Sequence, residues 1–67
     1  MTRRQRERAV LELIQSQPIK NQQHLVSELL SRGLEVTQAT VSRDIKRLGL
    51  VKVPQPDGSY RYASPQG

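Results

Sequence analysis

The segment from Thr37 to Lys52, TQATVSRDIKRLGLVK, contains both the start and the stop of one helix. Thr37 is a residue type that caps helix N-termini with its hydroxyl, and Gly49 is the type that ends helices in a left-handed conformation. Between them, apolar residues recur at the i, i+4, i+7 spacing of a buried helix face. These are Val41, Ile45 and Leu48. We expect a helix over residues 38–48.

The opposite face of this helix is polar, basic and slim. Ala39, Ser42, Arg43 and Lys46 also follow helical spacing, on the far side from the apolar residues. The DNA major groove admits one helix, and an arginine can place a bidentate contact on guanine there. The stripe alone fits a solvated helix surface as well as a DNA recognition helix. The helix-turn-helix spacing, the hairpin that follows and the basic first turn of the chain favour the recognition helix.

Other residues of the segment suit supporting contacts with DNA. Gln38, at the helix start, can pair with adenine, and Ser42 can reach a base edge or a phosphate. The hydroxyls of Thr37 and Thr40, with the free N–H groups of the first turn, can hold a phosphate. Lys46 and Arg47 suit phosphates further along the helix.

Two further helices precede this segment. Thr2 and Gln5 have the T-x-x-Q form of a capping box, and Pro18 stops the chain from continuing helical, so we expect a helix over residues 3–16. Asn21 can cap a second helix over residues 22–32, which Gly33 ends. Its expected apolar face consists of Leu25, Val26, Leu29 and Leu30.

A change of period after Gly49 predicts a β-hairpin. LVKVP and SYRYA alternate as strands do, and PQPDGS between them is rich in turn residues. We expect Val51 and Val53 to share a face with Tyr60 and Tyr62, which leaves Lys52 and Arg61 together on the other face. Both basic residues can then rest on the DNA backbone or minor groove, or simply protect a strand edge by charge.

The order of elements predicts a mainly helical α+β fold, a winged helix-turn-helix over residues 1–63, with 64–67 as the start of a linker. A chain of 67 residues forms one domain at most. The absence of cysteine fits a reducing cytoplasm, and no apolar run or signal peptide points to a membrane. We therefore expect a soluble, cytoplasmic protein.

The charge balance is strongly basic, with 11 Lys and Arg against six acidic residues and a formal net charge of +5. Four arginines lie in or near the first turn of the chain: Arg3, Arg4, Arg6 and Arg8. Cations at a helix N-terminus oppose the helix dipole, so a use for them is expected, and phosphate contact is the one we favour. With Lys46, Arg47 and Lys52, residues 3, 4 and 6 are expected to supply about five phosphate contacts.

From Thr37 to Pro54, TQATVSRDIKRLGLVKVP, the sequence resembles the N-terminal domain of the bacterial arginine repressors. The run from Thr37 to Ile45 is its most specific part, and the likeness extends over nearly all 67 residues. The resemblance implies a transcriptional repressor that binds palindromic, A/T-rich operators near genes of arginine biosynthesis and catabolism. It assigns the main DNA contacts to Ser42 and Arg43, with Gln38 and Thr40 assisting.

The same resemblance implies a second, C-terminal domain that binds L-arginine as co-repressor and assembles a hexamer. We expect that domain to be absent from these 67 residues. The isolated chain should then bind no cofactor and be a monomer or a weak dimer.

Two other kinds of function remain open from the residues alone. A basic RNA-binding domain needs exposed aromatic residues for stacking, and a protein-interaction winged helix needs an apolar patch on the third helix. An enzyme is not expected, because the chain has no cysteine, one isolated histidine (His24) and no paired carboxylates. For the same reason we expect no metal site.

Overall fold

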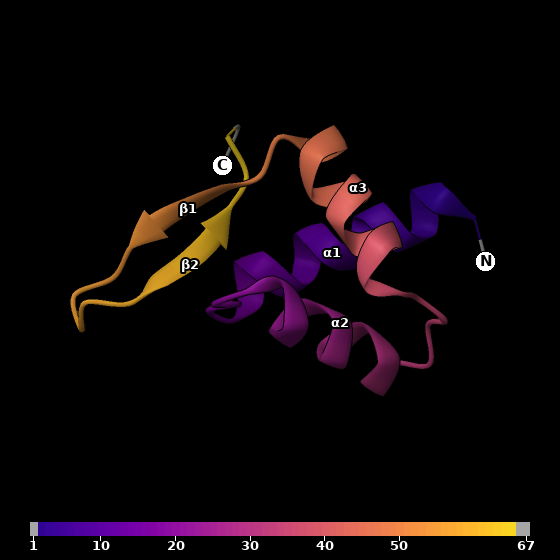
Figure 1. Ribbon diagram of the computed structural model, residues 1–67, viewed down its shortest axis with the longest axis horizontal. Helices are drawn as coiled ribbons and strands as arrows, with labels where there is room; N and C mark the ends of the chain where they lie inside the picture. Colours follow the sequence, from indigo (N-terminus) through magenta and orange to yellow (C-terminus); the bar gives the residue numbers. More distant parts are fainter. Residues whose placement is uncertain (1, 66–67) are drawn as a thin grey trace.

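The computed structural model describes residues 2–65, and the chain forms three helices followed by a two-stranded antiparallel hairpin. The helices are α1 (Arg3–Ser16), α2 (Gln22–Ser31) and α3 (Gln38–Leu48), and the strands are β1 (Val51–Pro54) and β2 (Tyr60–Ala63). Figure 1 shows the helices gathered into one body, with the hairpin extending from it as a wing. This is a winged helix-turn-helix, as the sequence predicts.

The helix boundaries follow from local capping. Thr2 and Gln5 form the complete capping box of α1, and the side chain of Asn21 accepts from the N–H of His24 at the start of α2. Thr37 caps α3 in the same way, accepting from the N–H of Thr40. Gly49 ends α3 with φ of 69°, a left-handed conformation that an L-residue with a Cβ rarely adopts. The predicted bounds of α1 and α3 are confirmed, and α2 ends one residue earlier than expected.

Aliphatic residues from every helix meet in a single core. The buried hydrophobic residues are Val10, Leu13, Ile14, Ile19, Leu25, Leu29, Leu34, Val41 and Tyr62. Ile19, just after Pro18, also accepts a backbone hydrogen bond from the N–H of Tyr62 at 2.9 Å, so the connection between α1 and α2 holds the inner edge of the wing. This connection fixes the wing against the helices.

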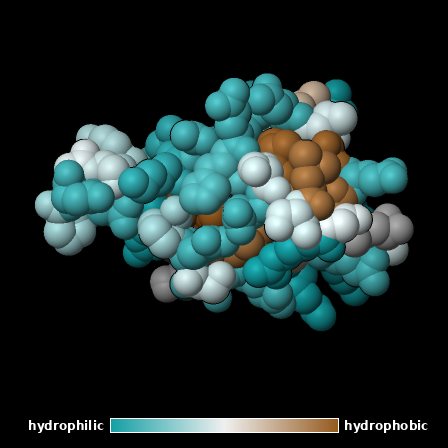
Figure 2. All heavy atoms as spheres, turned by 90° about the horizontal axis from the view of Figure 1, so that it is seen from below, coloured by the Kyte–Doolittle hydropathy of each residue, from teal (hydrophilic) through white to brown (hydrophobic). Residues whose placement is uncertain are grey.

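The apolar face expected for α2 was partly wrong. Leu25 and Leu29 are fully buried, and Val26 packs at the edge of the core, but Leu30 is 52% exposed. Residues 25 and 29 are one helical turn apart and point the same way, whereas residue 30 is turned a further 100° toward solvent. Figure 2 views the molecule from below and shows a patch of apolar surface surrounded by mostly hydrophilic side chains.

The hairpin register differs from the expectation. Lys52 pairs with Tyr62, and Val53 pairs with Arg61. Residues directly opposite in an antiparallel pair lie on the same face, so Lys52 shares a face with Tyr62, and Arg61 lies on the other. The predicted grouping of Val51 and Val53 with the tyrosines was wrong, since a shift of one residue moves every side chain to the other face.

The turn of the wing explains this register. Gln55 and Ser59 are joined by a backbone hydrogen bond from the N–H of Gln55, and the N–H of Gly58 donates to the carbonyl of Gln55. Pro56 and Asp57 occupy the middle of this turn, and Gly58 follows with φ of 90°. A turn followed by a left-handed glycine is the usual three-residue hairpin loop. The loop is therefore shorter than the six residues expected.

Candidate nucleic-acid interface

The recognition stripe of α3 is on the molecular surface. We use this name for Ala39, Ser42, Arg43 and Lys46. Ala39, Arg43 and Lys46 are exposed, and Ser42 is half-buried. Within residues 2–65 the side chains of Arg43 and Lys46 have neither an ion-pair nor a hydrogen-bond partner. Their donors are thus available to an external acceptor.

The inner face of α3 differs from the predicted one at a single important position. Val41 is fully buried, while Ile45 and Leu48 are half-buried beside the core. Asp44 is completely buried as well. A charged residue is rarely buried without a partner, and its partners come from α1 and from α3 itself.

Asp44 joins α3 to α1 through two arginines. The Nε and Nη2 groups of Arg6 both donate to its carboxylate, the second at 3.0 Å, and Nη1 of Arg47 donates at 2.9 Å. Nη1 of Arg47 also donates to Glu7 at 3.0 Å. We call Arg6, Glu7, Asp44 and Arg47 the charge cluster. The pair of Asp44 and Arg47 lies within α3 at i, i+3 spacing, and the pair of Asp44 and Arg6 joins α3 to α1, so the cluster sets the position of α3 on α1.

Asp44 and Arg6 stabilise each other's charged forms. Burial alone raises the pKa of Asp44, but the hydrogen bonds and charges of Arg6 and Arg47 outweigh it, so its pKa lies below the ordinary value. The pKa of Arg6 is raised by its hydrogen bond to Asp44. Both side chains are therefore charged at neutral pH.

The predicted phosphate-contacting residues fall into two groups. Arg4 and Lys52 are exposed, and Arg3 is held only by a 3.9 Å contact with Glu7, its side chain being 65% exposed. Arg6 and Arg47, by contrast, direct guanidinium donors to carboxylates of the charge cluster. The pairing of Arg6 with Asp44 could not be predicted from the sequence, since the two residues are 38 positions apart.

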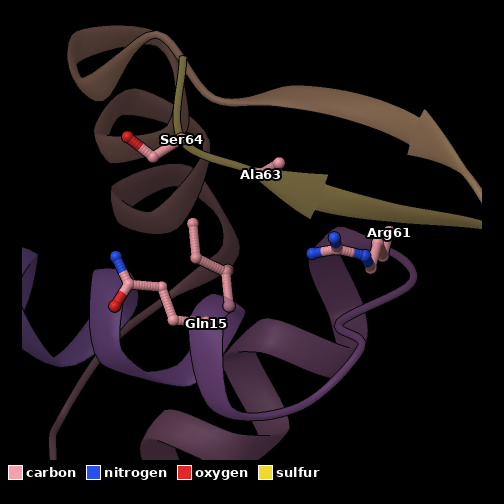
Figure 3. Close-up of a pocket in the computed structure, with 5 residues that line it drawn as sticks. Gln15, Arg61, Ala63 and Ser64 are labelled. Carbon is pink, nitrogen blue, oxygen red and sulfur yellow. The ribbon is translucent and has the colours of Figure 1, made fainter. Parts of the chain in front are cut away.

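Arg61 lies on the opposite face of the hairpin from Lys52. It lines a hollow with Ile14 and Gln15 of α1, and with Ala63 and Ser64. Figure 3 shows Arg61 extending from β2 over this hollow, next to the C-terminal part of α1. Lys52 lines a separate hollow with Gln38. The two basic residues of the wing therefore do not act on one surface.

Hydroxyls at the start of α3 are already hydrogen-bonded. Oγ1 of Thr37 accepts from the N–H of Thr40 and lies 3.1 Å from Oγ1 of Thr40. The carbonyl of Gln38 accepts from Nε2 of Gln22 at 2.8 Å, which ties α3 to α2. Within residues 2–65 the side-chain amide of Gln38 has no hydrogen-bond partner, so it remains available beside the recognition stripe.

The residues described between positions 2 and 65 contain no group of three His, Asp or Glu side chains that could hold a metal ion. His24 lies in the first turn of α2, where its Nδ1 accepts from the N–H of Lys20. None of the helices in this part of the chain is long and apolar enough to cross a membrane.

A capped, exposed basic helix on a helical base, followed by a wing, defines a winged-helix DNA-binding domain. Comparison with known families identifies it more closely: residues 1–67 match the family described as "Arginine repressor, DNA binding domain". The chain belongs to this family. It is therefore part of a regulator family and not of an enzyme family, as expected.

Individual relatives agree with this assignment. An arginine repressor of Moorella thermoacetica is 60% identical over 63 residues, which cover 94% of this chain and 42% of the relative. One of Symbiobacterium thermophilum is 50% identical over 98% of this chain and 44% of its own length. One of Bacillus velezensis is 55% identical over 97% and 44%, respectively. The chain thus spans less than half the length of these relatives.

Proposed function

We propose that this domain binds operator DNA as the DNA-binding part of an arginine repressor in the bacterial cytoplasm. In this proposal α3 enters the major groove of palindromic, A/T-rich operators at genes of arginine biosynthesis and catabolism. The observation that carries it is the recognition stripe: its basic side chains are exposed and unpaired within the described residues, while the rest of α3 is fixed to α1 and α2.

Arg43 is the residue to which we assign base reading, together with Ser42 and Gln38. Its guanidinium projects from the middle of the stripe, next to the small side chain of Ala39, which lets the helix approach the base edges. Bidentate contacts of this kind discriminate one base by about 1–3 kcal/mol. Lys46, Arg3, Arg4 and Lys52 supply phosphate contacts in this proposal, and Thr37 and Thr40 shape the start of the helix beside the backbone.

We give other roles to three of the residues that the sequence led us to expect at the DNA. Arg6 and Arg47 support the proposal indirectly, because their donors hold Asp44 and through it the orientation of α3. Arg61 faces the C-terminal part of α1, so we do not include it among the contacts made together with Lys52.

A gel-shift titration of the 67-residue chain tests this function. It compares a palindromic A/T-rich duplex with a scrambled and a G/C-rich duplex. We expect tighter binding to the operator, and Arg43→Ala should weaken operator binding by about 1–3 kcal/mol while changing scrambled-duplex binding little. Arg43→Lys should also lose discrimination, because an ammonium group lacks the planar fork.

Two results would count against the proposal. Equal affinity for all three duplexes would remove sequence-specific binding. Preferential binding to single-stranded RNA would favour the RNA-binding alternative. If Arg43→Ala weakens binding to operator and scrambled DNA equally, Arg43 is a phosphate anchor and Gln38 or DNA shape must carry the sequence preference.

We further propose that L-arginine and the hexamer interface belong to the part of the relatives that this chain does not span. Calorimetric titration of the chain with L-arginine should then show no heat of binding, and sedimentation should show a monomer or a weak dimer. Stoichiometric arginine binding by these residues would contradict this assignment.

A further inference from the structure

A polar hollow lies between the starts of α2 and α3 and the wing. We call it the flank hollow; it is lined by Asn21, Gln22, Gln23, Gln38, Lys52 and Tyr62. Every one of these side chains can donate a hydrogen bond, and no acidic side chain is among them. Because Lys52 is the one charged side chain in this lining, the hollow suits an anion.

Tyr62 is the most constrained member of this lining. The residue is only 8% exposed and its ring belongs to the core, while its hydroxyl is not fully enclosed and has no hydrogen-bond partner within residues 2–65. Burial also raises the pKa of Tyr62, so at neutral pH the hydroxyl keeps its proton and is a donor. The hydroxyl is therefore a donor that the hollow leaves accessible to an external acceptor.

Lys52 brings a positive charge to the same hollow. It lies opposite Tyr62 in the hairpin register, and its Nζ is 5.5 Å from the centroid of the tyrosine ring. Within the described part of the chain its ammonium group has no carboxylate partner. The ring thus positions a cation that is not neutralised by the protein.

The first turn of α2 forms the opposite wall. The N–H groups of Gln22 and Gln23 belong to the part of a helix that has no internal acceptors, and the helix dipole is positive there. The hydrogen bond from Nε2 of Gln22 to the carbonyl of Gln38 fixes this wall against α3. Donors from two helices and the wing therefore converge on one place beside the recognition stripe.

We propose that the flank hollow holds one phosphodiester group of the DNA backbone, bound by the hydroxyl of Tyr62, the ammonium group of Lys52 and the first turn of α2. The inference rests on the proposed DNA-binding function and assigns it a backbone subsite. A phosphate held next to Gln38 fixes the register of α3 in the groove, because phosphate contacts position a protein on the duplex.

Tyr62→Phe tests the hydroxyl, since it removes one oxygen and keeps the buried ring. We expect affinity for operator and scrambled duplexes to fall about tenfold, because the lost hydrogen bond is to a charged acceptor. Tyr60→Phe is the matched control: it removes the same group from an exposed tyrosine on the same face of the wing, outside the hollow, and should change affinity by less than about twofold. Equal affinities of wild type and Tyr62→Phe would overturn the proposal.

A chemically modified duplex gives a second measurement that does not depend on the stability of a variant. Single phosphates of the operator are replaced in turn by neutral methylphosphonates. At one phosphate per half-site the replacement should weaken wild-type binding, and the same replacement should have almost no further effect on Tyr62→Phe. If no phosphate shows this dependence on residue 62, the hollow does not hold the backbone.

Further comparisons separate the possible failures. If the wild-type chain binds no duplex, the proposed function is refuted and this inference with it. If the wild-type chain binds the operator and Tyr62→Phe binds it with equal affinity, only the subsite is refuted. Amide shifts of residues 22 and 23 should follow addition of duplex and not of inorganic phosphate. Equal shifts with inorganic phosphate would assign a site for a free anion instead.

Discussion

Asp44 stabilises the position of α3 through a carboxylate that has no solvent exposure and accepts from two arginines. In Asp44→Asn the size is kept, but the charge is lost and an amide donor faces the guanidinium groups. Because Arg6 and Arg47 are partly exposed and can turn to water, we expect a loss of about 1–3 kcal/mol in the free energy of unfolding. Chemical denaturation measures it, and Glu12→Gln at an exposed position of α1 is the control.

The same carboxylate predicts a dependence of stability on pH. The folded pKa of Asp44 lies below its ordinary value of 3.8, so the folded state binds the proton less readily than the unfolded state. Its contribution is then fully present above the ordinary value and is lost as the pH falls through the folded pKa. The difference in unfolding free energy between wild type and Asp44→Asn should be constant near neutral pH and shrink below about pH 4. A difference that persists undiminished in strong acid would show that the lost charge is not its source.

The charge cluster also shows the limit of sequence analysis for single residues. The pairing of Asp44 with Arg47 was predictable, because residues at i and i+3 are neighbours on a helix. The pairing with Arg6 was not, because it depends on how α1 packs against α3. Exposure of the recognition stripe followed from helical periodicity, whereas the free hydroxyl of Tyr62 is visible only in the folded chain.

At the scale of elements, α3 presents a surface whose shape can be tested separately from its charge. Ala39 is exposed, and leucine is nearly as good a helix former as alanine. Ala39→Leu should therefore leave the melting temperature nearly unchanged and weaken operator binding by about tenfold or more, because the larger side chain obstructs entry into the groove. Gel-shift titration and thermal melting measure the two effects. Gln15→Leu, at an exposed position on α1, is the control and should change neither quantity. A normal operator affinity of Ala39→Leu would contradict the placement of α3 in the major groove.

The elements also differ in how far their sequence determines them. Helix bounds were predictable because Thr2, Asn21, Thr37 and Gly49 act on backbone groups within one turn of themselves. The hairpin was predictable, but its register was not, because the left-handed Gly58 lets the loop close between Gln55 and Ser59. That closure decides which residues face each other, and it separates Arg61 from Lys52.

At the scale of the whole molecule, the charge cluster changes the expected salt dependence of DNA binding. Six basic residues were expected to give about five phosphate contacts, hence a slope of log affinity on log salt near −4 to −5. With Arg6 and Arg47 engaged by Asp44, the residues left are Arg3, Arg4, Lys46 and Lys52. Four contacts predict a slope of about −3.6 per domain, while the neutral donors of the flank hollow add affinity without adding to the slope.

Variants of Arg4 and Arg6 distinguish four phosphate contacts from five. Arg4→Ala should reduce the magnitude of the slope by about 0.9, because the variant releases one counterion fewer when it binds. It should weaken binding to the operator and to the scrambled duplex alike. Arg6→Gln should leave the slope unchanged and lower the melting temperature, since its guanidinium serves the fold. Titrations at several salt concentrations, with melting curves for each variant, measure both. If Arg6→Gln lowers the slope as much as Arg4→Ala does, Arg6 leaves Asp44 when DNA binds, and the charge cluster rearranges in the complex.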